Sequence, residues 1–135
     1  FLGSVQSGKF KGVYLVGGYP NEWVDDKTAA ALAKTPFLVV HDLFPSALDA
    51  SAAVQIPAAS WAEREGSFMN FDGLLQAFDR ALPPLEGVKA DGQFFQELTG
   101  GEGLFRAKRV REGMTATDSV FGEVFVPKDL PKHAH

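Results

Sequence analysis

A strand–helix–strand pattern near the start of the chain constrains the fold more than any other feature of the sequence. The run Gly12–Gly18, GVYLVGG, predicts a buried strand that ends in a tight turn. The segment Asn21–Lys34 has early acids, an Ala-Leu body and a final lysine, which predicts a helix. The segment Thr35–Asp42 is apolar on both faces, as strands of a covered parallel sheet are. The three segments predict a βαβ unit with a right-handed crossover.

Shorter elements are expected after this unit. Ser46–Ala52 is predicted to form a short helix, and Ala53–Pro57 a third short strand that Pro57 ends. The apolar runs SFMNF and LLQAF flank Asp72 and Gly73, a pair that indicates a hairpin or a bend. The predicted fold class is therefore α/β, with a small, mostly parallel, Rossmann-like sheet and flanking helices.

The last third of the chain has weaker patterns. Gly92–Leu98 is expected to form one or two turns of amphipathic helix, which the glycines of Gly100–Gly103 break. Leu104–Met114 is expected to be a helix with a poor apolar face. The last twenty residues show little pattern and are expected to be extended or mobile. We divide the chain into an α/β domain, residues 1–99, and a helical and extended tail, residues 100–135.

Composition excludes several classes of function. The 135 residues are 45% hydrophobic and 22% charged, which fits a soluble globular domain. A net charge of −4 argues against a nucleic-acid partner, and the lack of cysteine excludes disulfides and iron–sulfur clusters from this segment. No apolar run approaches the roughly 20 residues that span a bilayer. Because the chain begins without methionine, we expect it to be a piece of a longer protein.

Four segments resemble, in order and spacing, the C-terminal α/β region of the molybdopterin oxidoreductase superfamily. The family has a strand ending in Gly-x-Asn-Pro, and this chain has GGYP at Gly17–Pro20. The family's Asp-x-Phe-x-Thr-Glu-Thr resembles the end of His41–Leu48, and its Ala-Asp-Val-Val-Leu-Pro resembles the start of Ala52–Ala59. Its most specific motif, Glu-x-x-Gly-Thr-x-x-Asn-x-Glu-Gly-Arg-x-Gln, resembles Glu63–Gln76. The resemblance covers about two-thirds of the chain. It is strongest to the large iron–sulfur subunit of bacterial complex I, the respiratory NADH-quinone oxidoreductase.

The chain departs from the family at positions that are polar in its cofactor-binding members. The family's Asn in the first motif is Tyr19, its Asp before the apolar run is Ala53, and its Arg in the last motif is Leu74. Further changes fall at Ser46, Ala47, Leu48, Ser67 and Asp72. The family's residue is kept at Asp42, Phe44, Glu63, Gly66, Asn70, Gly73 and Gln76. The resemblance therefore implies a fragment of a larger molybdopterin-oxidoreductase-type fold whose cofactor pocket has degenerated.

The chemistry of the cofactor supports this interpretation. A pterin dinucleotide carries phosphates, amides and guanine edges, and each buried polar group left without a partner costs about 1–3 kcal/mol. Ala47, Leu48, Ala53 and Leu74 offer no polar group. A pocket filled by such aliphatic side chains is expected to be a core.

The resemblance then implies a structural or assembly domain of a respiratory NADH-quinone oxidoreductase, with no complete active site and no catalytic or metal-binding residue in this chain. Its expected partners are the rest of the parent chain and other complex I subunits, with iron–sulfur clusters elsewhere in the parent. The expected location is the cytoplasmic face of the bacterial membrane, without insertion. The alternative is a domain that binds molybdopterin guanine dinucleotide in a molybdenum oxidoreductase of the formate dehydrogenase type.

Seven residues are candidates for a vestigial cofactor site: Asp42, Glu63, Gly66, Asn70, Asp72, Gly73 and Gln76. For Glu63, a catalytic role would need a titrating partner in a cleft. Its neighbours are Arg64 and Glu65, which favours a solvated charged turn or a carboxylate that caps backbone amides.

Structural interpretations are also favoured for the other candidates of this loop. Asn70 and Asp72 are residue types whose side-chain oxygens commonly bond nearby amides in turns. Gly66 and Gly73 are most simply positions that need a permissive backbone.

Other motifs carry weaker signals. His41 stands alone at a strand's carboxyl end, and the tail's His133 and His135 have no carboxylate or cysteine to complete a metal site. The glycines of Gly100–Gly103 lack the strand and the Lys-Ser/Thr of a phosphate loop. The basic segment Arg106–Glu112 fits a solvated helix face or a contact with an acidic subunit. A free-standing nucleotide-binding module would need Gly-x-Gly-x-x-Gly after the first strand, and the chain has GGYPNEW there.

Overall fold

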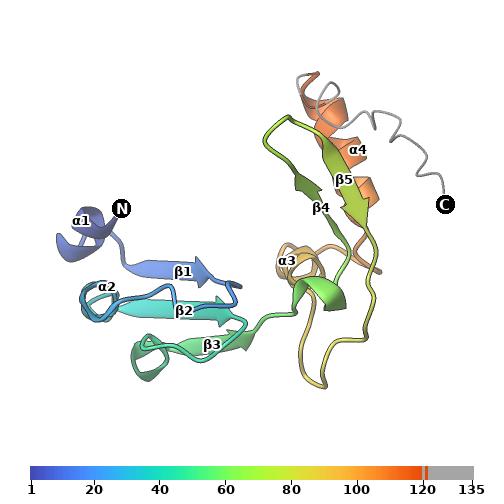
Figure 1. The fold of residues 1–135 in the computed structure, drawn as a ribbon. Helices are drawn as coiled ribbons and strands as arrows, with labels where there is room; N and C mark the ends of the chain where they lie inside the picture. Colours follow the sequence, from blue (N-terminus) through green and yellow to red (C-terminus); the bar gives the residue numbers. More distant parts are fainter. Residues whose placement is uncertain (120, 122–135) are drawn as a thin grey trace. The chain divides into compact units, whose positions relative to one another are not determined.

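A computed structural model describes residues 1–119 and 121 of the chain (Figure 1). The described residues form two compact units. The first consists of Phe1–Ser60 and Pro84–Ala90, and the second of Trp61–Pro83 and the residues from Asp91 onward. The predicted domain boundary after residue 99 stays a prediction.

The first unit contains a three-stranded parallel sheet (Figure 1). Its strands are β1 (Gly12–Val16), β2 (Phe37–Asp42) and β3 (Val54–Pro57), in the order β1-β2-β3. Val16 of β1 lies beside His41 of β2, so the carboxyl ends of these two strands meet at one edge of the sheet. The predicted α/β fold with a small parallel sheet is confirmed.

One face of this sheet packs against helices and forms the core. Side chains alternate between the two faces along a strand, so Val13 and Leu15 of β1 share a face with Leu38 and Val40 of β2. We call this the helical face. It packs with Val5 of α1 (Leu2–Gln6), Leu32 of α2 (Asp26–Leu32) and two residues of the connections, Val24 and Leu48.

The crossover helix is shorter than Asn21–Lys34, the predicted segment. It begins at Asp26 because the Asp25 side chain accepts a hydrogen bond from the Thr28 amide at 2.7 Å and caps the first turn. The residues before Asp25 form part of a loop at the sheet edge instead of a first helical turn.

The segment predicted as a second helix, Ser46–Ala52, forms only a single 3-10 turn, η1 (Asp49–Ser51). Both carboxylate oxygens of Asp49 accept hydrogen bonds from Ser46, one from its amide at 3.2 Å and one from its hydroxyl at 3.4 Å. These bonds close a compact turn, which takes the place of a longer helix.

The second unit is built around a hairpin. A 3-10 turn, η2 (Trp61–Glu63), precedes the antiparallel strands β4 (Gly66–Met69) and β5 (Leu75–Phe78). The predicted hairpin is confirmed. Two helices complete the described part of the unit, α3 (Asp91–Leu98) and α4 (Ala107–Thr117).

The two C-terminal helices differ in how well their bounds were predicted. The segment Gly92–Leu98 agrees with α3 within one residue. The predicted helix Leu104–Met114 overlaps α4, but its first residue and its last residue both lie earlier in the chain than those of α4. The glycines between them end α3: Gly100 has φ +79°, a left-handed conformation that suits a residue without a side chain. Most of the last twenty residues, which were expected to be extended or mobile, lie outside the described residues, as do His133 and His135.

Within residues 1–119 and 121, no helix has the length and apolar character needed to cross a bilayer.

Candidate functional site at the carboxyl ends of the parallel strands

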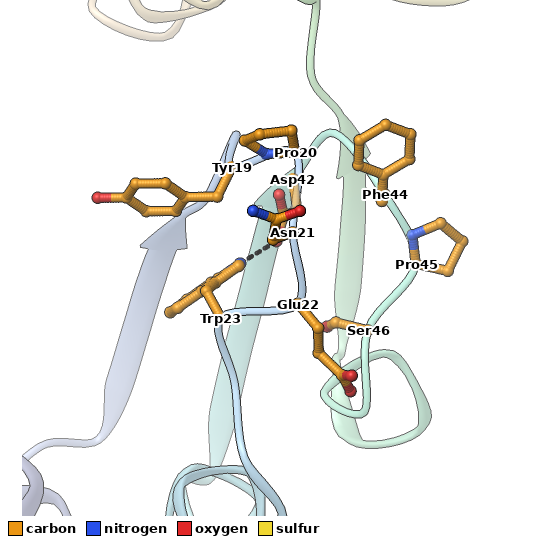
Figure 2. A pocket seen from close by; sticks show the side chains of 9 residues that line it. All are labelled: Tyr19, Pro20, Asn21, Glu22, Trp23, Asp42, Phe44, Pro45 and Ser46. Atoms are coloured by element: carbon orange, nitrogen blue, oxygen red, sulfur yellow. Dashed lines mark hydrogen bonds between the residues drawn. The ribbon is translucent and has the colours of Figure 1, made fainter.

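A pocket of about 320 Å³ lies at the carboxyl ends of β1 and β2 (Figure 2). This is the edge where open parallel sheets place their ligands. The loop after β1 and the loop after β2 form its walls, and Asp42, the last residue of β2, lies between them. The lining residues are Tyr19, Pro20, Asn21, Glu22, Trp23, Asp42, Phe44, Pro45 and Ser46.

Asp42 holds the two loops of this pocket in place. Its Oδ1 accepts the backbone N–H of Gly18 at 2.8 Å and that of Leu43 at 2.7 Å. Its Oδ2 accepts the indole N–H of Trp23 at 2.8 Å, which Figure 2 marks as a dashed line. Both oxygens of the carboxylate are therefore engaged by groups of this chain.

Gly17 makes the approach of Asp42 to the first loop possible. A Cβ built on Gly17 would lie 2.2 Å from the Asp42 carboxyl carbon, far inside van der Waals contact. The first glycine of the GGYP motif is therefore required by close packing against a carboxylate. Gly18 has φ +118°, which lets the chain turn while its amide points at Asp42.

The walls of the pocket are aromatic and acidic. The rings of Tyr19 and Trp23 are 6.2 Å apart at 52°, and Phe44 lies on the opposite side of Asp42 (Figure 2). Glu22 and Asp42 are the charged residues of the lining, and no lysine or arginine of the described chain takes part in it. Such a lining offers no positive charge to neutralise the phosphates of a dinucleotide.

The aliphatic replacements occupy different environments, which refines the expectation that they fill a core. Leu48 is fully buried in the core of the first unit, as expected. Ala47 and Ala53 are not buried, and Leu74 is half-buried in the hairpin. Only Leu48 therefore shows that a polar position of the family has become part of a core.

The structure divides the predicted site residues between the two units. Asp42 lies in the first unit, and the other six lie in the second. Glu63 is the last residue of η2, and Gly66 is the first residue of β4. Gln76 is exposed on β5, opposite Phe68.

Asn70 and Gly73 build the turn of the hairpin. The Asn70 side-chain oxygen accepts the amides of Asp72 at 3.0 Å and Leu74 at 2.8 Å. Gly73 has φ +78°, and its amide bonds the Asn70 carbonyl at 3.1 Å. Asp72 is exposed at the tip of this turn. These contacts give Asn70 and Gly73 a structural role within the chain.

Gly66 has a packing role. A Cβ at Gly66 would lie 2.7 Å from the ring of Phe78, its partner across the hairpin. That ring stacks on Phe68 with centroids 4.8 Å apart and planes 15° apart. Because Gly66 has no side chain, the ring of Phe78 can lie directly over the backbone of β4.

No motif of the sequence indicated the polar contacts that link Arg64, Glu65 and Ser67 to the two C-terminal helices. Glu65 accepts the Ala107 amide at the start of α4 at 2.6 Å, and its other carboxylate oxygen pairs with Arg106 at 3.2 Å. Arg111 of α4 donates to the Ser67 hydroxyl at 2.6 Å. Glu65 and Ser67 are more than 40 residues from these partners in sequence, so no local pattern could have revealed the contacts.

A second contact of this kind connects the loop to α3. Arg64 forms an ion pair and hydrogen bond with Asp91, the first residue of that helix. An acidic residue at the start of a helix stabilises the helix through its dipole. The ion pair also connects the start of α3 to Arg64, which lies between η2 and β4.

His41 is a buried side chain of the sheet. It has no exposed surface, and its Nδ1 lies 3.0 Å from the Tyr14 hydroxyl. The two rings meet edge to face, with centroids 6.1 Å apart. Burial raises the pKa of the Tyr14 hydroxyl.

The segment Gly100–Gly103 also has a structural role. The side-chain amide of Gln96 donates to the carbonyls of Glu102 at 2.8 Å and Gly103 at 3.0 Å. The glycines therefore form a turn that folds back on α3.

Comparison with known proteins identifies a family for this chain. The family described as molybdopterin oxidoreductase matches residues 2–100. The chain is 34% identical over 100 residues to the putative formate dehydrogenase YrhE of Bacillus subtilis, covering 72% of this chain and 10% of that protein. It is 30% identical over 96 residues to the NADPH-Fe(3+) oxidoreductase subunit alpha of Geobacter sulfurreducens, covering 70% and 11%.

Formate dehydrogenase H of Escherichia coli is 29% identical over 93 residues, covering 67% of this chain and 13% of that protein. The chain thus spans only about a tenth of the length of these relatives. The family match includes the whole parallel sheet, both loops of the pocket and the hairpin with its turn at residues 70–73. The chain belongs to the molybdopterin oxidoreductase family.

Proposed function

We propose that this chain is a structural and assembly domain of the large iron–sulfur subunit of a respiratory NADH-quinone oxidoreductase, bacterial complex I. In this proposal the family fold is retained and the cofactor pocket has degenerated. Electron transfer is carried by iron–sulfur clusters elsewhere in the parent protein. The partners are the rest of that protein and the other complex I subunits, at the cytoplasmic face of the membrane.

The observation that carries the proposal is the engagement of Asp42. Its two carboxylate oxygens accept three hydrogen bonds from Gly18, Leu43 and Trp23. A ligand that formed a hydrogen bond with this carboxylate would have to displace the indole of Trp23 or share an oxygen with it. The described residues of the lining include no lysine or arginine, so they offer no positive charge to the phosphates of a dinucleotide. This also supports a degenerate cofactor pocket.

A second candidate function is favoured by the relatives. Formate dehydrogenases are prominent among the similar proteins. The chain would then hold part of a molybdopterin guanine dinucleotide in a molybdenum oxidoreductase of the formate dehydrogenase type. Asp42, Asn70 and Gln76 would be the first residues to test as ligands.

Metal and pterin analysis of the full-length protein distinguishes the two functions. We expect neither molybdenum nor tungsten, and no pterin fluorescence after oxidation, in a preparation that retains its iron. Stoichiometric molybdenum and pterin would overturn the structural proposal. In that case Asp42→Asn should lower the pterin content, whereas Asp79→Asn, at an exposed residue after β5 that does not line the pocket, should leave it unchanged.

A further inference from the structure

The dipeptide Asp-Gly occurs twice in the chain, as Asp72 with Gly73 in the hairpin turn and as Asp91 with Gly92 at the start of α3 (Figure 1). In this dipeptide the glycine nitrogen can attack the carboxyl carbon of the aspartate side chain, because glycine carries no side chain that hinders the approach. The two copies have the same local chemistry. A difference in reactivity between them must therefore come from the fold.

The first copy lies in the open at the tip of the hairpin. Asp72 and Gly73 are both exposed, and the preceding Phe71 is 97% exposed. Within the described residues, the Asp72 carboxylate takes part in no hydrogen bond or ion pair, although its backbone amide donates to Asn70. A Cβ built on Gly73 would meet no described atom within 4 Å. The carboxyl group and the glycine nitrogen therefore have space to approach each other.

The hydrogen bonds of the turn are the barrier to this attack. The Gly73 amide donates to the Asn70 carbonyl at 3.1 Å, so its nitrogen can react only when that bond opens. Residues 70–73 are all exposed, and they end a sheet of only two strands. Such a turn opens at a low cost in free energy, because few buried contacts hold it closed.

The second copy is held in place on both sides. The Asp91 carboxylate forms an ion pair with Arg64, and its side chain is 16% exposed. Gly92 lies in the first turn of α3, where a Cβ would be 2.5 Å from the ring of Phe105. That ring leaves the backbone of Gly92 little room to rotate toward the carboxyl group. Attack here requires the ion pair and the start of the helix to open together.

We propose that Asp72 is a site of spontaneous isomerisation to isoaspartate, from which the fold protects Asp91. The Gly73 nitrogen forms a bond to the side-chain carboxyl carbon of Asp72 and loses its proton, and one carboxyl oxygen leaves as water. The product is a cyclic succinimide. Water then adds to one of the two ring carbonyls, the bond from that carbon to nitrogen breaks, and the nitrogen regains a proton. Opening at the side-chain carbon restores aspartate, and opening at the main-chain carbon gives isoaspartate.

Isoaspartate would disturb the turn that holds the hairpin. Its main chain runs through the former side chain, so the backbone gains one carbon and the old main-chain carboxyl becomes a free carboxylate. The Asn70 side chain bonds the amides of Asp72 and Leu74, and the extra carbon changes the spacing of these amides. We expect the pairing of Met69 with Leu75, next to the turn, to loosen in the isomerised protein.

Peptide mapping of the aged full-length protein tests the proposal. The protein is kept at physiological temperature and neutral pH in water enriched in heavy oxygen, because each passage through the succinimide introduces an oxygen from water. Mass spectrometry then measures label and isoaspartate at residues 72 and 91, and isoaspartate is recognised by its retention and its backbone fragments. The same protein unfolded in denaturant gives the reference rate at each residue.

The expected result is a large difference between the two copies in the folded protein alone. Relative to their unfolded rates, isomerisation at residue 91 should be slowed at least ~10-fold more than isomerisation at residue 72. Isoaspartate should also accumulate measurably at residue 72 over weeks. A smaller difference, or no isoaspartate at residue 72, would overturn the proposal.

Two variants test the mechanism. Asp72→Glu keeps the charge and has the family's residue, but its longer side chain would have to close a six-membered ring, so label at residue 72 should be lost while label at Asp91 is unchanged. Asn70→Ala removes the acceptor of two turn amides and should raise the rate at residue 72 several-fold. Persistent label in Asp72→Glu, or an unchanged rate in Asn70→Ala, would contradict the mechanism. Neither readout depends on molybdenum or pterin content, so failure here is distinguishable from failure of the proposed function.

Discussion

At the scale of single residues, the pocket edge is organised by close backbone approach to one carboxylate. Gly17 lies against Asp42, and the amide of Gly18 donates to it. The same carboxylate holds the indole of Trp23. One side chain thus fixes two loops, which explains why small residues follow β1 directly.

Gly17→Ala should therefore disturb the pocket edge. The added methyl group would overlap the carboxylate of Asp42, and relief of such overpacking typically costs about 1–3 kcal/mol. Gly3→Ala in α1 is the control, because a Cβ there meets no described atom within 4 Å. Urea unfolding of both variants measures the difference. A Gly17→Ala protein as stable as Gly3→Ala would show that Asp42 can move at no cost.

The cap of α2 predicts a pH dependence. Hydrogen bonds from Thr28 lower the pKa of Asp25 in the folded protein. A carboxyl whose folded pKa is depressed stabilises the protein above its unfolded pKa, about 4, and loses that contribution as the pH falls through the folded value.

Asp25→Ala should thus be less stable than the unaltered protein near neutral pH, and the gap should narrow below about pH 4. Asp25→Asn keeps a capping oxygen that does not titrate, so its stability relative to Asp25→Ala should be independent of pH. Unfolding titrations across this range provide the measurement. A gap that widened in acid would contradict the capping role.

At the scale of elements, α4 depends on a cap from a distant part of the chain. Arg106, the residue before the helix, makes no side-chain cap bond within the described residues, and Glu65 supplies the acceptor for the Ala107 amide instead. The helix has a poor apolar face, as expected from its sequence, so polar contacts carry much of its attachment to the hairpin.

Glu65→Ala should loosen the start of α4. Loss of a capping oxygen typically costs about 0.5–2 kcal/mol, and the first amides of the helix should exchange faster with deuterium. Glu112→Ala removes an exposed pair with Lys108 at 3.7 Å and should change stability by less than about 0.5 kcal/mol. Similar exchange in both variants would mean that α4 does not need the cap.

At the scale of the whole molecule, the core of the first unit limits which of the family's polar residues could be put back into this chain by substitution. Leu48 stands where cofactor-binding members have a threonine, and it is fully buried among Val5, Leu32 and Val40. Its side chain belongs to the core between sheet and helices and does not line the pocket.

Leu48→Thr should destabilise the protein without creating a binding site. A buried hydroxyl without a partner costs about 1–3 kcal/mol, and the smaller side chain adds the cost of a cavity. Ala47→Ser, at a neighbouring position outside the core, should change stability by less than about 0.5 kcal/mol. Thermal unfolding of both variants is sufficient. A Leu48→Thr protein of unchanged stability would contradict the core assignment.

The sequence by itself determined the class of fold and most of the elements, because those depend on local patterns. The continuous apolar run in Gly12–Val16 and the doubly apolar Phe37–Asp42 indicate strands of a covered parallel sheet. The pair Asp72 and Gly73 indicated the hairpin or bend, since turn chemistry lies within a few residues, and the structure has a hairpin whose turn Asn70 and Gly73 build. The motifs also indicated the family, which the comparisons confirmed.

The tertiary structure decided what the polar side chains contact. The sequence showed that Asp42 matches the family's residue at this position. Only the folded structure showed that Trp23 and Gly18 donate hydrogen bonds to its carboxylate oxygens. Glu65 reaches a helix more than 40 residues away, and no local pattern encodes that distance. Ala47 and Ala53 were expected to fill a core together with Leu48, and folding left both alanines exposed. Contacts between segments distant in sequence depend on the packing of the whole chain, so they were decided only when the chain folded.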